Sequence, residues 1–176
     1  MTDAAGAASV HASAVKVGDR AVLIRGPSGA GKSRLALDLI LAGRSGQIPP
    51  AVLVGDDRVF LDAGNGKLLV RPARELAGLI EIYGLGIDSC DFADEATVGL
   101  VIDLSAADAE RLPPPEALVT RISGIKIPRI PVGMGIAALP LVVAALTMTA
   151  ISYSSQPLAD CSKGIGNHIS PTIATE

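Results

Sequence analysis

The chain has 176 residues, which is enough for one domain with a buried core and short for two. It is 49% hydrophobic with a mean hydropathy of +0.45, a composition that excludes an intrinsically disordered protein. The net charge is −3 and the sequence has no basic block, so we expect no nucleic-acid partner.

Short apolar segments separated by turn residues follow one another along the chain. Aromatic residues make up only 2% of it, so the core must consist of Val, Ile, Leu and Ala, which suits buried strands flanked by helices. We expect strands over 10–17, 20–25, 51–55 and 97–104, a hairpin over 58–70, and helices over 32–42, 106–112 and 141–148. Gly43 is expected to cap the first helix.

The order of the first elements predicts the fold class. A strand, a glycine-rich loop, a helix and a strand ending in acidic residues are the order of an α/β nucleotide-binding core. The later part is rich in strands and departs from simple alternation, which predicts a mixed β-sheet. We expect a flexible N-terminus over 1–9, one domain over 10–150, and a mobile polar tail over 151–176.

Two features bear on the location of the protein. Residues 130–151 carry no charge and are long enough to cross a membrane, but Pro131, Pro140 and two glycines interrupt them, so we expect no membrane span. Cys90 and Cys161 match no metal or redox spacing, and the first residues do not form a signal peptide. These features predict free thiols and a cytoplasmic protein.

The most specific motif is G-x-x-x-x-G-K-[ST], the phosphate-binding P-loop. Its residues are Gly26, Pro27, Ser28, Gly29, Ala30, Gly31, Lys32 and Ser33. The glycines let successive backbone N–H groups surround a phosphate, next to the positive end of the following helix. Lys32 is expected to reach the β- and γ-phosphates of ATP, and the Ser33 hydroxyl to bind Mg²⁺. A predicted strand before the motif and a predicted helix after it favour this function over a chance match.

Three further acidic residues and one histidine are candidates for the same site. Asp56 and Asp57 end a predicted strand, where one carboxylate can serve Mg²⁺ and the other can accept a proton. A solvated Asp-Asp turn is the alternative for this pair. His11 by itself is more typical of a partly buried structural residue. Glu81 has apolar neighbours, so we expect it to be buried near an arginine or Mg²⁺.

Taken together, four segments resemble the kinase domain of bacterial HPr kinase/phosphorylase. They are residues 10–11, the P-loop, residues 53–59 and residues 78–87, and the resemblance covers about residues 10 to 135. It implies the short form with the kinase domain alone and a fold related to phosphoenolpyruvate carboxykinase. It also implies an ATP- and Mg²⁺-dependent protein-serine kinase that acts on the phosphocarrier HPr, the reverse phosphorolysis of phosphoseryl-HPr, and a hexamer.

The resemblance also implies roles for individual residues. Asp57 would be the base in phosphorylation and the acid in the reverse reaction, with Asp56 beside it, and His11 would lie near the phosphates. Ser33 and Glu81 would serve the metal. The family has an arginine-bearing loop where residues 125–139 are apolar here, and Arg129 is the candidate for that catalytic arginine.

The chain departs from the family signature at Tyr83, which stands where an arginine is usual. Rival functions remain open at this point: a P-loop kinase for a small molecule, a nucleoside-triphosphate hydrolase, or a nucleotide-binding regulator that has lost catalysis. A guanine-specific GTPase would usually have an Asn-Lys-x-Asp motif, which this chain lacks. A small-molecule kinase would usually have a lid with several arginines, whereas Arg129 is the only arginine in residues 128–148 of this sequence.

Overall fold

The computed structural model describes residues 8–148. The expected mobile tail and most of the expected flexible N-terminus lie outside the described residues, as does Cys161. The elements in chain order are β1 (Ala8–Val10), β2 (Ser13–Val17), β3 (Arg20–Arg25), α1 (Lys32–Arg44), β4 (Ala51–Gly55), β5 (Val59–Gly64), β6 (Lys67–Pro72), η1 (Arg74–Leu76), β7 (Leu79–Ile82), β8 (Gly86–Ser89), β9 (Ala96–Leu104), η2 (Pro115–Leu118), β10 (Val119–Ile122), β11 (Ile125–Val132) and α2 (Ala138–Thr147).

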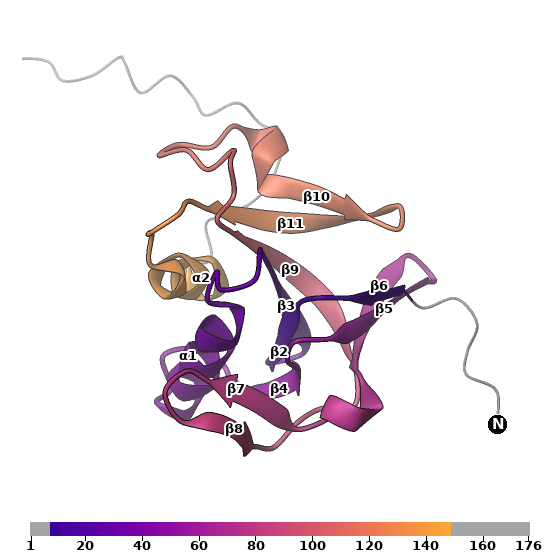
Figure 1. The fold of residues 1–176 in the computed structure, drawn as a ribbon. Coiled ribbons are helices and arrows are strands. Elements are labelled where there is room, and N and C mark those ends of the chain that lie inside the picture. The colour runs from indigo at the N-terminus through magenta and orange to yellow at the C-terminus, as the bar shows by residue number, and fades with distance from the viewer. Residues whose placement is uncertain (1–7, 149–176) are drawn as a thin grey trace, which may run out of the picture.

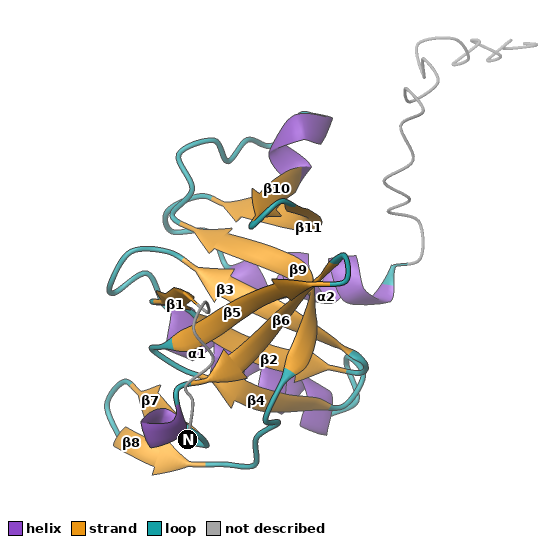
Figure 2. Ribbon diagram, turned by 90° about the vertical axis from the view of Figure 1, so that its right-hand side faces the viewer, coloured by secondary structure: helices purple, strands orange, loops and turns teal. Residues whose placement is uncertain are grey.

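Within residues 8–148, nine strands form one mixed sheet and β7 and β8 form a separate two-stranded ribbon. The main path of the large sheet is β1-β5-β6-β9-β3-β2-β4 (Figure 2). β9 is the central strand of this sheet. β3 pairs in parallel with one side of β9, and the other side pairs with β6 (antiparallel) and β11 (parallel). The expectation of an α/β fold with mixed strand directions is therefore confirmed.

The pairing directions decide which chain segments meet at one edge of this sheet. β2 runs antiparallel to both of its neighbours, β3 and β4, so these two strands run in the same direction. β9 runs parallel to β3. The carboxyl ends of β3, β4 and β9 and the beginning of β2 therefore lie at the same edge. Ligands of open α/β sheets gather at this kind of edge.

The two helices cover one face of the sheet, and Figure 1 shows them side by side. Alternate residues of β3 divide the core: Val22 and Ile24 face the helices, whereas Ala21 and Leu23 face the layer made by β5 and β6. α1 contributes Leu35 and Leu39 to the helical side, as its apolar spacing predicts. Within residues 8–148, no helix is long and apolar enough to cross a membrane.

Three expectations about local structure are wrong. Residues 106–112 form turns and not a helix, since so short a segment holds a helix only when it packs. Gly43 does not cap α1, which continues through it to Arg44 and has Ser45 as its C-cap. A Cβ atom at Gly43 would lie 2.7 Å from Ala51, so the glycine serves close packing there. The strand expected over 10–17 is interrupted, because β1 pairs with β5 and β2 pairs with β3 and β4.

The hairpin of β10 and β11 has no counterpart among the expected strands. Prolines at positions 128 and 131 argue against a strand, because proline cannot donate a hydrogen bond within a sheet. The structure places both prolines in β11, opposite Val119 and Asp103. A signal was present in the Ser123-Gly124 pair, since both residues have positive φ in the turn.

Candidate functional site

The P-loop leaves the end of β3 and enters α1, as predicted. Gly26 lies so close to β9 that a Cβ atom would be 3.0 Å from both the carbonyl oxygen and the Cβ atom of Leu104. Gly31 is the residue before α1 and has a φ of 91°, which a residue with a side chain rarely adopts. These two glycines therefore explain why the loop can turn tightly and present its N–H groups at the start of the helix.

A cavity of about 680 Å³ opens beside the P-loop. Its walls come from the loop, the outer side of α1, the end of β4 and the β7–β8 ribbon. The predicted site residues that line it are His11, Ser28, Gly29, Gly31, Lys32, Ser33, Asp57 and Glu81. Gly26, Pro27 and Ala30 belong to the same loop but do not line the cavity. Asp56 and Arg129 do not line it either. The volume is within the range of small-molecule sites.

The Lys32 side chain is folded against the P-loop. Its Nζ atom donates hydrogen bonds to the carbonyl oxygens of Gly26 and Pro27, each at 3.1 Å. Burial lowers the pKa of the ammonium group from its ordinary value, and the charges of Asp57 and Asp56 oppose that effect. The two carbonyl contacts are weaker partners than phosphate oxygens, so this amine is suited to binding a nucleotide.

His11 and Asp57 meet although 46 residues separate them, because β2 begins where β4 ends. The Nδ1 atom of His11 lies 3.0 Å from the Asp57 carbonyl oxygen and 3.1 Å from a carboxylate oxygen of the same residue. Asp57 has a φ of 63°, a left-handed conformation that aspartate tolerates better than most residues. The histidine therefore contacts a strained backbone position whose carboxylate faces the cavity.

The neighbouring carboxylate, Asp56, has a different environment. Its side chain is buried, with one oxygen accepting a hydrogen bond from the Ser13 hydroxyl at 2.5 Å and the other from the Glu81 backbone N–H at 3.0 Å. Ser13 is itself fully buried at the beginning of β2. Asp56 therefore links β2, the end of β4 and β7. Sequence reasoning missed Ser13, and the only signal was a serine among the apolar residues of a predicted strand.

Glu81 is exposed, so the expectation of a buried carboxylate is wrong. β7 belongs to a two-stranded ribbon, in which Ile80 packs against α1 and the next residue points away from that core. Glu81 lines the cavity together with Ser33. A hydroxyl and a single carboxylate suit Mg²⁺, which keeps several waters and binds phosphate oxygens. Within the described residues, no three His, Cys, Asp or Glu side chains form a metal-binding group.

Arg129 lies in β11, where its guanidinium group is held by two carboxylates. It donates to Asp103 at 2.5 Å and to both oxygens of Asp108 at 2.6 and 2.9 Å. Asp103 also receives two hydrogen bonds from Arg25, the last residue before the P-loop. Burial would raise the pKa of Asp103, but its hydrogen bonds with Arg25 and Arg129 lower it below the ordinary value. The hydrogen bonds that Arg129 donates to Asp108 raise the pKa of the guanidinium above its ordinary value.

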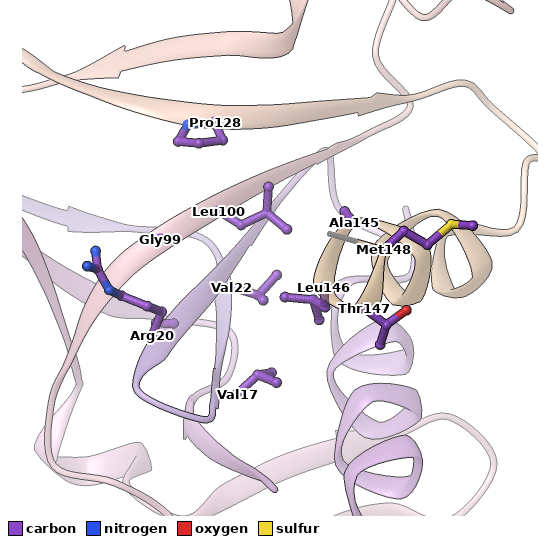
Figure 3. Close-up of a pocket in the computed structure, with 11 residues that line it drawn as sticks. Val17, Arg20, Val22, Gly99, Leu100, Pro128, Ala145, Leu146, Thr147 and Met148 are labelled. Carbon is purple, nitrogen blue, oxygen red and sulfur yellow. The ribbon is translucent and has the colours of Figure 1, made fainter. Parts of the chain in front are cut away.

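A second cavity of about 390 Å³ lies between α2 and the sheet (Figure 3). Apolar side chains such as Val22, Leu100 and Leu146 dominate its wall, and Arg20 is the charged residue among those that line it. No predicted site residue lines this cavity. It lacks the convergent polar groups that fix a substrate, so the candidate site is the P-loop cavity.

Comparisons with known proteins give the family of this chain. The family model for the HPr Serine kinase C-terminal domain matches residues 2–159. The HPr kinase/phosphorylase of Mycoplasma mycoides subsp. mycoides is 30% identical over 163 residues, which is 85% of this chain and 50% of that protein. The HPr kinase/phosphorylase of Streptococcus pyogenes serotype M5 is 35% identical over 134 residues, which is 69% of this chain and 41% of that protein.

A solved structure, the Hpr(Ser) kinase/phosphatase from Coxiella burnetii, matches with a TM-score of 0.63 and 29% identity. That match covers 80% of this chain and 94% of the other. The chain spans half or less of the length of the two curated relatives above. The family model nevertheless matches most of the chain, and the solved structure shares its fold. The chain therefore belongs to the family of the HPr serine kinase C-terminal domain.

Proposed function

We propose that the protein is a protein-serine kinase that transfers the γ-phosphoryl group of ATP to a seryl residue of HPr. The observation that carries this proposal is the P-loop cavity, in which Lys32, Ser33, His11, Asp57 and Glu81 come together from four separate segments. Relatives named HPr kinase/phosphorylase supply the identity of the acceptor protein.

The residues of the cavity divide the reaction between them. The P-loop N–H groups and Lys32 bind the phosphates, and the Asp57 carboxylate accepts the proton of the attacking serine hydroxyl. His11 holds Asp57 in position through its contacts with the carbonyl and carboxylate oxygens. Ser33 and Glu81 would hold Mg²⁺, which when bound neutralises charge on the phosphates.

We also propose the reverse reaction, phosphorolysis of phosphoseryl-HPr, because the curated relatives are named kinase/phosphorylase. In this reaction inorganic phosphate attacks the phosphorus of phosphoserine and the bond to the serine oxygen breaks. Asp57 gives its proton to that oxygen, and pyrophosphate is released. Arg129 remains the candidate arginine for this reaction. Its ion pairs with Asp103 and Asp108 would have to open before it could bind phosphate, so the cavity supports the kinase direction better.

Partners and location follow from the same proposal. We propose a homo-oligomer, a hexamer by family resemblance, for which the exposed apolar residues Met134, Ile136, Leu141 and Met148 offer an interface. A cytoplasmic location agrees with ATP as the phosphoryl donor. The proton acceptor at Asp57 favours a kinase over a regulator that only binds nucleotide.

Incubation with ATP, Mg²⁺ and purified HPr is expected to add one phosphoryl group to HPr, measured by intact mass. A Ser-to-Ala variant of HPr at the modified position is the control and is expected to gain no mass. ATP turnover without any mass gain on HPr would contradict the proposal and favour the hydrolase.

The substitution Tyr83→Arg is expected to raise the affinity for ATP about two- to fivefold, the size typical of an exposed charge interaction. Tyr83 lines the cavity with Glu81, and an arginine there would add a permanent positive charge close to the phosphates. Equilibrium titration with a fluorescent ATP analogue measures the effect, with Tyr83→Gln as the neutral control. Equal affinities in both variants would show that this chain has compensated for the missing charge.

A further inference from the structure

The turn of the β7–β8 ribbon presents large apolar side chains to solvent. Tyr83 is 99% exposed, Leu85 is 84% exposed and Ile87 is 74% exposed. Glycines 84 and 86 on either side of Leu85 add no side chains that could cover them. In Figure 1 the ribbon lies beside α1 at the margin of the molecule. A contiguous group of exposed apolar residues usually marks a surface that binds another molecule.

This surface continues directly from the P-loop cavity. Glu81, Ile82 and Tyr83 line the cavity, and the next side chain along the ribbon is Leu85. A protein that presents a serine to the phosphates must also cover surface next to the cavity, and this turn is part of that surface. The protein that carries such a serine is therefore expected to lie against Leu85 and Ile87, whereas a small acceptor would not reach them.

The segment around the apolar turn is acidic. Residues 75–95 contain six carboxylates and no lysine or arginine: Glu75, Glu81, Asp88, Asp91, Asp94 and Glu95. Among the described residues, Glu75 is the member of this set with an ion pair, to Arg58 at 3.6 Å. The surface therefore suits a partner with an apolar patch surrounded by basic side chains.

The turn is also closed by a backbone hydrogen bond. The Leu85 backbone N–H donates to the Ile82 carbonyl oxygen at 2.9 Å, and Gly84 and Gly86 have positive φ. Within β7 and next to the turn, Asp56 accepts a hydrogen bond from the Glu81 backbone N–H. A surface that is ordered in advance loses less conformational entropy when a partner binds.

We propose that the β7–β8 turn is the docking surface for the protein substrate, which contacts it through an apolar patch that surrounds the target serine and has a basic rim. This inference rests on the proposed kinase function. It assigns Leu85 and Ile87 a role in binding the acceptor protein and no role in binding ATP. The acidic residues Asp88 and Asp91 attract the basic rim.

The double variant Leu85→Ser/Ile87→Ser tests the apolar contact. The KM for HPr is expected to rise about tenfold, which corresponds to about 1.4 kcal/mol of binding free energy. The kcat and the affinity for ATP are expected to stay within about twofold, since neither side chain lines the cavity. Leu112→Ser is the matched control, because Leu112 is as exposed as Leu85 and lies outside the ribbon.

A second variant tests the charge. Asp91→Lys is expected to raise the KM for HPr about threefold, and the wild-type KM is expected to rise between about 0.05 and 0.3 M KCl as the charges are screened. Titration of HPr into each variant by calorimetry is expected to show the same loss of affinity. Light scattering on the double variant is expected to show the wild-type oligomeric state.

The outcomes separate the docking surface from the kinase function. A wild-type protein that phosphorylates HPr, with an unchanged KM in both variants, overturns the docking surface alone. A wild-type protein that phosphorylates no HPr overturns the kinase function and the docking surface with it. An oligomer that dissociates in the double variant while the KM for HPr is unchanged assigns the surface to a second copy of the chain and overturns the proposal.

Discussion

Asp57→Asn is expected to lower the kcat for HPr phosphorylation by about 10²- to 10⁴-fold, the usual contribution of a general base. The amide cannot accept the proton of the serine hydroxyl at neutral pH, and Asp57 is the carboxylate of the adjacent pair that faces the cavity. ATP affinity is expected to stay within about twofold, because the P-loop and Lys32 hold the phosphates. Intact mass of HPr over time gives the rate, and a fluorescent ATP analogue gives the affinity.

This variant is expected to keep the fold. Asp57 is exposed with a φ of 63°, and asparagine adopts this conformation as readily as aspartate. The free energy of unfolding is expected to change by less than about 0.5 kcal/mol, measured by urea denaturation. Full kinase rate in this variant would show that Asp57 is not the proton acceptor.

Asp56→Asn is expected to destabilise the protein by about 2–3 kcal/mol, the range for losing a buried hydrogen bond to a charged group. Both Asp56 oxygens accept hydrogen bonds, from Ser13 and from the Glu81 backbone N–H. An asparagine keeps one acceptor and turns an N–H group toward a second donor, so one buried donor loses its partner. Urea denaturation of the wild type and the variant measures the change in unfolding free energy.

The neighbouring substitution provides the control, because Asp57→Asn makes the same chemical change one residue away at an exposed side chain. Ser13→Ala is expected to show a smaller loss, since it removes the donor and leaves Asp56 bonded to Glu81. A double-mutant cycle between Ser13 and Asp56 is expected to give a coupling energy of about 1 kcal/mol. Equal unfolding free energies for wild type and Asp56→Asn would contradict this structural role.

The P-loop and its flanking elements could be predicted from the sequence because their signals are local. The glycines, Lys32 and Ser33 are consecutive, and α1 follows with its apolar residues at helical spacing. The hairpin of β5 and β6 also has its turn residues between two short apolar runs. The β10–β11 hairpin was missed for the opposite reason: two prolines within β11 concealed a strand that its neighbours stabilise.

The roles of the two aspartates required the tertiary structure. In the sequence Asp56 and Asp57 are equivalent neighbours at the end of a strand. In the structure they follow β4 in a bend, where Asp57 takes a left-handed φ of 63°, and Asp56 is buried while Asp57 is exposed. Ser13 and Glu81, which bind Asp56, are 43 and 25 residues away in the chain. Glu81 itself was expected to be buried, and it is exposed because its neighbour Ile80 takes the side of β7 that packs against α1.

The sequence by itself therefore determined the nucleotide-binding loop, the α/β class and part of the set of residues that line the P-loop cavity. Those properties follow from consecutive residues, whose spacing fixes backbone conformation and periodicity. Tertiary structure alone decided that His11 contacts Asp57, that Arg129 is held by Asp103 and Asp108, and that the β7–β8 turn is exposed beside the cavity. Such contacts depend on strand order and direction, and these are set by the packing of segments distant in the chain.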